Sequence, residues 1–275
     1  MADVPIHDAT DPRLAALVAA DVERIGVSAA AGALDADRIA LLAGLVDDAL
    51  AQDLTWYPDG REVDEGRVVF LPRYGREFLD LLVEPALMAP VERILGEDCT
   101  LYTMTTLCQD PGSPGRPQHV DTQYVVPDFI VGLGVMVTLD DFTAESGPTR
   151  FHPEVTIEEP DPADFEERAL RLEVPAGSVC WFHGRIWHDA LPNRTDRPRR
   201  AILAAMVRPW VRQRFDMAPM LAHLGVEEFP LPLRRKLGLE QIPPGSYEEF
   251  FLPDDSRRQE LLRRAAARAA TTPAG

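Results

Sequence analysis

The character of the sequence changes at Gly96, and this change constrains the fold more than any other feature. Over about residues 10–96, apolar residues recur at three- and four-residue spacing, which is typical of one face of a helix. After Gly96, short segments rich in Val, Thr, Leu and Tyr are bounded by glycine and proline, which is typical of strands and turns. Helices first and strands afterwards, without regular alternation, predict an α+β fold.

Three helices are expected in the first part of the chain. The first begins near Leu14. The second has Asp35 as its N-cap, because a short acidic side chain there can accept a hydrogen bond from the first turn. The third, residues 78–95, is expected to be interrupted at Pro85 and Pro90, since proline removes a helical hydrogen bond.

The strands expected after Gly96 form a core of about residues 97–210. Clusters of turn residues separate them, and many short strands with such turns favour a sandwich or open barrel of the jelly-roll kind. The candidate strands are 100–108, 131–139, 168–174, 178–182 and 200–207. An Arg-rich helical tail is expected at 255–270. Because the sequence has neither a repeat nor a linker, residues 1–275 are expected to form one domain.

Charge and composition narrow the class of partner. The net charge is −17 and the pI about 4.7, so phosphate backbones would repel the chain, and we expect a small-molecule partner and no nucleic acid. No apolar run approaches the ~18 residues that a membrane span needs, and the N-terminus does not read as a signal peptide. We therefore expect a cytoplasmic monomer or homodimer without a membrane partner. The cysteines Cys99, Cys108 and Cys180 lack C-x-x-C spacing and predict neither a disulfide framework nor a zinc ribbon.

The segment 118–121 places a histidine and a carboxylate two residues apart. Alternate side chains of an extended strand share a face, so His119 and Asp121 would project into the same cavity. They would supply two ligands of a facial triad, in which two histidines and one carboxylate leave positions on Fe(II) open for a cosubstrate and O₂. Taken alone the pattern is weak, since such a pair is more often a surface feature.

The segment 175–200 strengthens the argument. A tight turn leads into an apolar strand, followed by His188, a turn at Pro192, and a strand that opens with Arg199 and Arg200. We expect His188 and the arginine to lie on neighbouring antiparallel strands. A 2-keto dicarboxylate that chelates iron needs such a cation for its distal carboxylate, and the planar fork of arginine suits this task. Strand alternation lets only one of the two arginines face the site, and Arg199 is favoured.

Three motifs stand in an order that resembles the phytanoyl-CoA dioxygenase family of Fe(II)/2-oxoglutarate oxygenases. They are HVD, VMVTLDDFTAESGPTRFHP and AGSVCWFHGRIWHDALPNRTDRPRRAI, and the resemblance spans about residues 118–206. It implies a double-stranded β-helix (jelly-roll, cupin-like) core with N-terminal helices packed on it. It also implies Fe(II) at His119, Asp121 and His188, and 2-oxoglutarate at Arg199.

The same resemblance implies further site residues and a reaction. Thr149 stands where a residue often supports the cosubstrate, while Gln118 and Thr122 are weaker candidates beside the metal ligands, and Tyr102 is weaker still. The implied reaction is O₂-dependent oxidation, by default hydroxylation, of a small organic metabolite, and natural-product metabolism is favoured. Desaturation, cyclisation and epimerisation at the same site stay open. Halogenating relatives replace the carboxylate ligand by a small residue, so Asp121 argues against halogenation.

Some features leave alternatives open. Ala190 stands where many family members have a small polar residue, and the loop 152–155 departs from the family's Gly-Ser-His. His183 competes with His188 as the third ligand. Two other classes of protein remain: a non-catalytic cupin-like binding protein that retains the triad, and a zinc-dependent hydrolase, which would have no need of Arg199.

Overall fold

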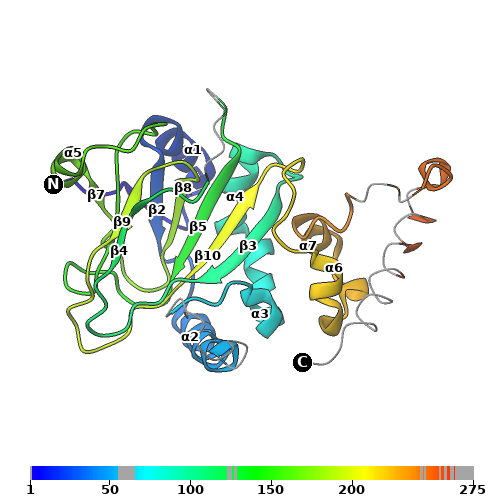
Figure 1. Cartoon of the computed structure of the whole chain (residues 1–275), viewed down its shortest axis with the longest axis horizontal. Helices are drawn as coiled ribbons and strands as arrows, with labels where there is room; N and C mark the ends of the chain where they lie inside the picture. The colour runs from blue at the N-terminus through cyan, green and yellow to red at the C-terminus, as the bar shows by residue number, and fades with distance from the viewer. Residues whose placement is uncertain are drawn as a thin grey trace.

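Two facing sheets and a set of covering helices make up the protein (Figure 1). The computed structural model describes residues 2–54, 66–122, 126, 129–241, 244, 246–253, 255–256, 259–260 and 263. Among these residues, no helix combines the length and the apolar character that crossing a membrane would require.

The main sheet collects strands from both ends of the sequence. Its strands are β1 (Ile6–Asp8), β2 (Val27–Ala31), β3 (Thr100–Thr106), β5 (Gly132–Thr138), β8 (Val179–His183) and β10 (Ala201–Val207). They follow the order β1-β2-β8-β5-β10-β3. The pair β1–β2 is parallel and the other neighbouring pairs are antiparallel.

The second sheet is smaller and carries the residues of chemical interest. Its strands are β4 (Arg116–His119), β6 (Thr149–Phe151), β7 (Leu170–Arg171) and β9 (His188–Ala190). They follow the order β4-β9-β6-β7, and every neighbouring pair is antiparallel. Strands that are far apart in the sequence therefore lie side by side in both sheets, as in a jelly roll.

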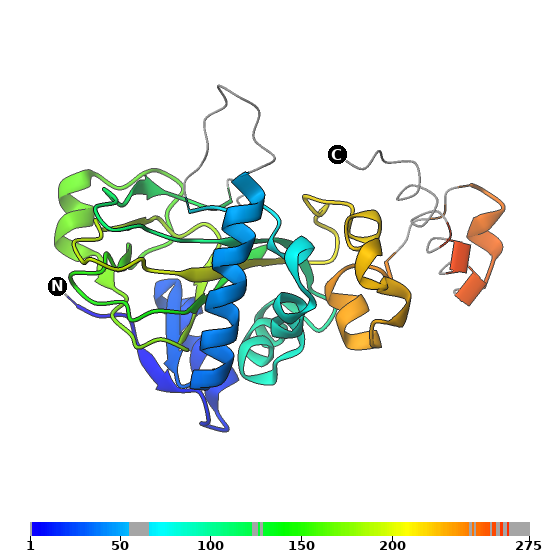
Figure 2. The same cartoon turned by 90° about the horizontal axis from the view of Figure 1, so that it is seen from below.

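Most of the helices pack on the outer face of the main sheet, whereas α5 lies beside the second sheet (Figure 1). The α-helices are α1 (Leu14–Ile25), α2 (Ala36–Asp53), α3 (Arg76–Asp80), α4 (Pro85–Leu95), α5 (Pro162–Arg168), α6 (Met217–Met220) and α7 (Leu231–Lys236). Short 3₁₀ helices are η2 (Leu71–Tyr74), η3 (Leu81–Val83), η4 (Ala222–Leu224), η5 (Val226–Glu228) and η6 (Glu249–Phe251). Figure 2 shows the long helix α2 crossing the strands beside the segment that holds α3 and α4.

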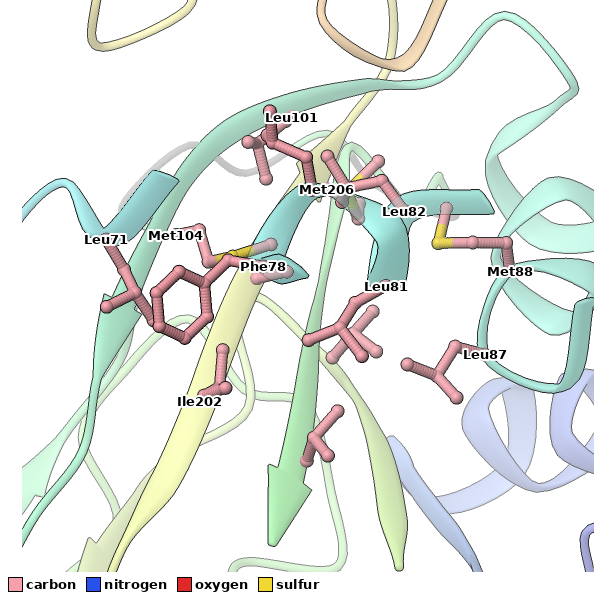
Figure 3. Packing of buried hydrophobic residues seen from close by; sticks show 14 of the residues in the cluster. Leu71, Phe78, Leu81, Leu82, Leu87, Met88, Leu101, Met104, Ile202 and Met206 are labelled. Atoms are coloured by element: carbon pink, nitrogen blue, oxygen red, sulfur yellow. The ribbon is translucent and has the colours of Figure 1, made fainter. Parts of the chain in front are cut away.

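The period-two pattern of the central strands divides the core into two layers. In β10, Ile202 and Met206 pack with the helices in one cluster, whereas Leu203 belongs to a second cluster that joins the two sheets. Figure 3 shows Phe78 and Leu82 of the helical segment on the side of the main sheet that carries Ile202 and Met206. The helices thus support one face of the sheet and leave the other face free to enclose a site.

The fold class predicted from the sequence is confirmed. Strands β3, β5 and β10 fall within three of the five expected segments, and β8 overlaps a fourth, extending one residue beyond it to His183. Helix α2 begins directly after Asp35, whose carboxylate accepts a hydrogen bond of 2.8 Å from the backbone N–H of Arg38. The cysteines Cys99, Cys108 and Cys180 are buried free thiols.

Other expectations are wrong in part. The region 10–96 contains strand β2, an alanine-rich segment that pairing with β1 and β8 holds extended. Within the expected strand 168–174, only Leu170–Arg171 forms a strand, β7. Helix α5, capped by the side chain of Asp161, continues to Arg168 and takes up the start of the expected segment. Helix α4 continues through the buried Pro90. The expected tail helix at 255–270 falls mainly outside the described residues.

Candidate metal centre

Strands β4 and β9 bring two histidines together. The strands are antiparallel neighbours, and His119 is paired with His188 in their register. The centroids of the two imidazole rings lie 4.2 Å apart. Paired residues of adjacent strands project from the same face of a sheet, so both rings point to the same side.

Asp121 joins the two histidines from the segment that follows β4. The strand ends at His119 and the chain bends at Asp121, so the two side chains converge at a strand end and not along a continuous strand. The Oδ1 atom of Asp121 lies 3.9 Å from Nε2 of His188. One ligand atom of each of the three residues lies within 4.8 Å of the other two. Small side-chain rotations would let all three bind one ion at the usual ~2.1 Å.

Backbone hydrogen bonds set the tautomer of both imidazoles. Nδ1 of His119 lies 2.8 Å from the carbonyl oxygen of Pro117, and Nδ1 of His188 lies 3.0 Å from that of Ile186. A carbonyl only accepts, so each Nδ1 carries the proton and donates it. Each Nε2 therefore keeps its lone pair, which is the arrangement typical of metal-binding histidines.

The surroundings of the triad favour neutral, fixed imidazoles. His188 is 7% exposed, and the rings of Phe151 and Phe182 lie 5.7 and 5.3 Å from its own. Burial, followed by the neighbouring His188, lowers the pKa of His119. A neutral imidazole is the form that binds a metal.

A cavity of about 220 Å³ opens over the triad between the two sheets. We call it the metal cavity. The main sheet contributes Phe182 and Leu203 to its lining, and the second sheet contributes the histidines and Thr149. Four further polar or charged side chains also line the metal cavity: Arg67, Arg116, Asp189 and Arg199.

Arg199 is a buried cation on this cavity. It is 3% exposed, and burial lowers the pKa of its guanidinium to about 10. One terminal N–H donates to the carbonyl oxygen of Gly147, and the guanidinium carbon lies 4.3 Å from the ring centroid of Phe142. Its Nε is buried and has no hydrogen-bond partner, and no carboxylate of the described residues forms an ion pair with it.

The neighbouring Arg200 is engaged elsewhere. Its guanidinium makes ion pairs of 2.9 Å with Asp140 and 2.7 Å with Asp47. The expected route to Arg199 needs correction, however. Arg199 precedes β10 of the main sheet while His188 lies on β9 of the second sheet, so the two face each other across the sandwich and are not on neighbouring strands. The connection between them crosses from one sheet to the other.

Arg116 also lines the metal cavity but is not predicted from the sequence as a site residue. It lies three residues before His119, so strict alternation would place the two on opposite faces. The register of β4 against β9 shifts between these two residues, which brings both side chains to the cavity. No sequence pattern marks such a shift.

Two predicted cosubstrate residues do not reach the metal cavity. The side-chain amide of Gln118 donates a hydrogen bond of 3.1 Å to the carbonyl oxygen of Pro160. Thr122 lines two neighbouring cavities, as Tyr102 lines one of them. Adjacency to His119 and Asp121 in the sequence is therefore a poor guide, because Gln118 is engaged with Pro160 and Thr122 lies beyond the end of β4.

His183 lies apart from the triad. Its Nδ1 accepts a hydrogen bond of 2.9 Å from the backbone N–H of Arg185, so the remaining nitrogen of the neutral ring carries the proton and is a donor. Burial and then Arg185 lower the pKa of His183 to about 4. His152 is 2% exposed and its Nε2 lies 3.0 Å from Asp164, so it is a structural residue.

The residues present fit iron and a dicarboxylate. Two imidazoles with free Nε2 atoms and one carboxylate form the donor set typical of non-haem Fe(II) oxygenases. The unsatisfied Nε of the buried Arg199 on the same cavity calls for an anionic acceptor. A cosubstrate with a carboxylate at each end would meet both requirements.

Comparison with known proteins identifies the family. The sequence profile of the phytanoyl-CoA dioxygenase family matches residues 16–201. The chain therefore belongs to this family, and it is an Fe(II)/2-oxoglutarate-dependent dioxygenase whose cofactors are Fe(II) and 2-oxoglutarate.

Individual relatives are distant. The uncharacterized protein Rv1501 of Mycobacterium tuberculosis is 26% identical over 201 residues, which cover 70% of this chain and 74% of that protein. The Fe(II)/2-oxoglutarate-dependent dioxygenase nvfF of Aspergillus novofumigatus is 26% identical over 167 residues, covering 58% of this chain and 56% of nvfF. The epimerase SnoN, solved with Fe³⁺, α-ketoglutarate and nogalamycin RO, has 22% identity and a TM-score of 0.60, covering 72% of this chain and 85% of SnoN. This last likeness shows a shared fold.

Proposed function

We propose that His119, Asp121 and His188 hold Fe(II) and that Arg199, with Thr149 beside it, holds the distal carboxylate of 2-oxoglutarate. One observation carries this proposal: two imidazoles with free Nε2 atoms, a carboxylate and a buried guanidinium line a single cavity. When bound, iron and 2-oxoglutarate supply the oxidising chemistry, in which O₂ is reduced, 2-oxoglutarate becomes succinate and CO₂, and the substrate is oxidised.

The chain's own groups prepare the site for this chemistry. The carbonyl oxygens of Pro117 and Ile186 orient the two imidazoles, as outer hydrogen bonds do in other metal sites. Phe151 and Phe182 pack against His188 and limit the access of water. The carboxylate of Asp121 would offset part of the charge of the metal.

The burial of Arg199 contributes to selectivity for the cosubstrate. A guanidinium in a site from which water is largely excluded interacts with a carboxylate more strongly than one in water. It also orients the ligand, because two parallel N–H groups match two carboxylate oxygens. A monocarboxylic 2-keto acid would leave this cation unpaired and is expected to bind more weakly.

We further propose that the reaction is hydroxylation of a small organic metabolite, in specialised metabolism. The carboxylate of Asp121 supports oxygenation over halogenation, because it would occupy the coordination position that a halide needs. SnoN is described as an epimerase from nogalamycin biosynthesis, which supports the metabolic context. A desaturase, cyclase or epimerase would use the same site and differ in its product.

The test is a screen of candidate substrates for release of succinate in the presence of Fe(II), 2-oxoglutarate and ¹⁸O₂. We expect succinate in step with a product that gains one ¹⁸O atom, and loss of both in Asp121→Ala even with added chloride. A halogenated product would contradict the reaction type. Turnover that needs zinc but neither 2-oxoglutarate nor O₂ would contradict the whole proposal, and absence of succinate across a broad panel would favour a binding protein.

A further inference from the structure

A second, larger cavity lies beside the metal centre. It has a volume of about 530 Å³, and we call it the outer cavity. It shares Thr122, Val131 and Gly132 with a cavity of about 400 Å³, the middle cavity. The middle cavity in turn shares Val120 and Asp121 with the metal cavity. The three cavities thus share walls and lie next to one another, in the order outer, middle and metal cavity.

A buried cation lines the outer cavity. Arg185 is 8% exposed, and its Nε is buried without a hydrogen-bond partner among the residues that the structure describes. One terminal N–H donates to the carbonyl oxygen of Ile157, and the guanidinium carbon lies 5.5 Å from the centroid of the Trp187 ring. Within the described part of the chain no carboxylate lies in ion-pair distance of it. A guanidinium removed from water is costly unless an anion satisfies it.

His183 adds a second donor at the same place. Its Nδ1 accepts from the backbone N–H of Arg185, so its proton resides on Nε2. Burial keeps the pKa of this ring at about 4, so the ring stays neutral at physiological pH and the donor is present. The outer cavity therefore offers a cation and a neutral N–H donor that lie two residues apart, at the end of β8 and in the turn after it.

The rest of this path is apolar. Four lining residues of the outer cavity are large hydrophobic side chains that remain exposed, by 36% or more of their surface: Val126, Phe129, Val155 and Ile157. The ring of Trp210 stacks on Phe129 at 5.8 Å and is 65% exposed. Among the described lining residues, the acidic side chain is that of Glu23, which lies on α1 and is exposed. Such an apolar mouth, with polar donors inside, is typical of a ligand site.

We propose that the substrate of this enzyme is an apolar organic acid whose carboxylate is bound by Arg185 and His183. Its apolar body lies in the outer and middle cavities and presents the carbon to be oxidised next to Asp121. This inference rests on the proposed function for the identity of the reacting site, but the anion site itself, formed by Arg185 and His183, does not depend on it. It is separate from the cosubstrate anion site at Arg199.

The test uses three probes with one apolar body and different heads: biphenyl-4-carboxylate, biphenyl-4-ylmethanol and biphenyl-4-ylmethanamine. Binding is measured by calorimetry without O₂ on protein loaded with Fe(II) and saturated with 2-oxoglutarate, so that Arg199 is occupied. We expect the carboxylate to bind about tenfold or more tightly than the alcohol, because a charge-assisted hydrogen bond is added. The amine is expected to bind more weakly than the alcohol.

Variants locate the effect. Arg185→Gln is expected to remove the preference for the carboxylate while the alcohol binds as before, which also shows that the cavity stays folded. Arg185→Lys should retain part of the preference. Arg93→Gln, an exposed arginine of α4, is the matched control and should change nothing. Equal affinities for carboxylate and alcohol, a preference that survives Arg185→Gln, or failure of the carboxylate to bind would each overturn the inference.

The proposed function and the proposed substrate class can be contradicted independently of each other. Affinity for 2-oxoglutarate should be unchanged in Arg185→Gln, because that ligand is assigned to Arg199. If the carboxylate preference is lost in Arg185→Gln but no substrate of any class gives succinate, the proposed function is wrong and the anion site stands. If succinate is released with substrates that lack an acidic group and binding ignores Arg185, the function stands and the inference is wrong.

Discussion

Replacing Arg199 by methionine is expected to weaken 2-oxoglutarate binding without destabilising the unliganded protein. Arg199 is 3% exposed, and its Nε has no acceptor within the described part of the chain. Burial lowers its pKa from 12.5 to about 10, which corresponds to a cost of ~3 kcal/mol for keeping the charge buried. Because the folded-state pKa is depressed for a base, the whole cost is present below pH 10 and is relieved only as the pH rises from about 10 towards 12.5.

Two contacts offset part of that cost. Arg199 donates to the carbonyl oxygen of Gly147 and stacks on Phe142, together worth ~1–2.5 kcal/mol. Methionine retains most of the apolar contact. The free energy of unfolding of the unliganded variant is therefore expected to change by between ~0 and ~2 kcal/mol in the stabilising direction. Loss of the partner of the distal carboxylate costs ~2–5 kcal/mol of binding, so the Kd for 2-oxoglutarate should rise by about 30-fold or more.

The assay combines urea unfolding of the unliganded protein with calorimetric titration of 2-oxoglutarate in the presence of Fe(II) and absence of O₂. Arg200→Met is the matched control. It removes the ion pairs with Asp140 and Asp47, so it should lower stability and leave the Kd nearly unchanged. Equal changes in Kd at both positions, or an Arg199→Met protein that is destabilised yet binds 2-oxoglutarate normally, would refute the reasoning.

Three further predictions follow from the site. Metal analysis after dialysis should find no iron retained by His188→Ala but close to one iron per chain in His183→Ala, and the reverse result would exchange their roles. Asp189→Asn breaks a pair with buried Arg150, at 3.0 and 2.6 Å, and should lower the free energy of unfolding by ~3 kcal/mol; a change below ~1 kcal/mol in urea unfolding would contradict this. Burial raises the pKa of the Cys108 thiol to about 12, so iodoacetamide should not modify the folded protein at pH 7.5 by mass spectrometry, whereas rapid modification would show the thiol to be accessible.

Local signals explain which parts of the fold the sequence predicts. Helix α2 is predicted because its cap and its apolar spacing are properties of a short window around Asp35. Strands β6 and β9 have three residues each and are too short to show a period. Their conformation is set by pairing with strands that are distant in the sequence: β9 pairs with β4 and β6, and β6 pairs with β9 and β7.

The same distinction applies to the site. His119, Asp121 and His188 could be predicted because they stand in sequence motifs with a characteristic order and spacing. The structure brings all three side chains together. Arg116 is missed because a local shift of register decides which way it points. The tautomer that sets His183 apart from the triad depends on a hydrogen bond with Arg185, which only three-dimensional coordinates reveal.

The central claim is tested most directly by a crystal structure of the protein grown with Fe(II) and 2-oxoglutarate in the absence of O₂. The account predicts one iron bound by Nε2 of His119, a carboxylate oxygen of Asp121 and Nε2 of His188, at ~2.0–2.2 Å. The keto-acid end of 2-oxoglutarate should complete the coordination, with its distal carboxylate on Arg199. Iron bound at His183, or a distal carboxylate that leaves Arg199 without a partner, would contradict it.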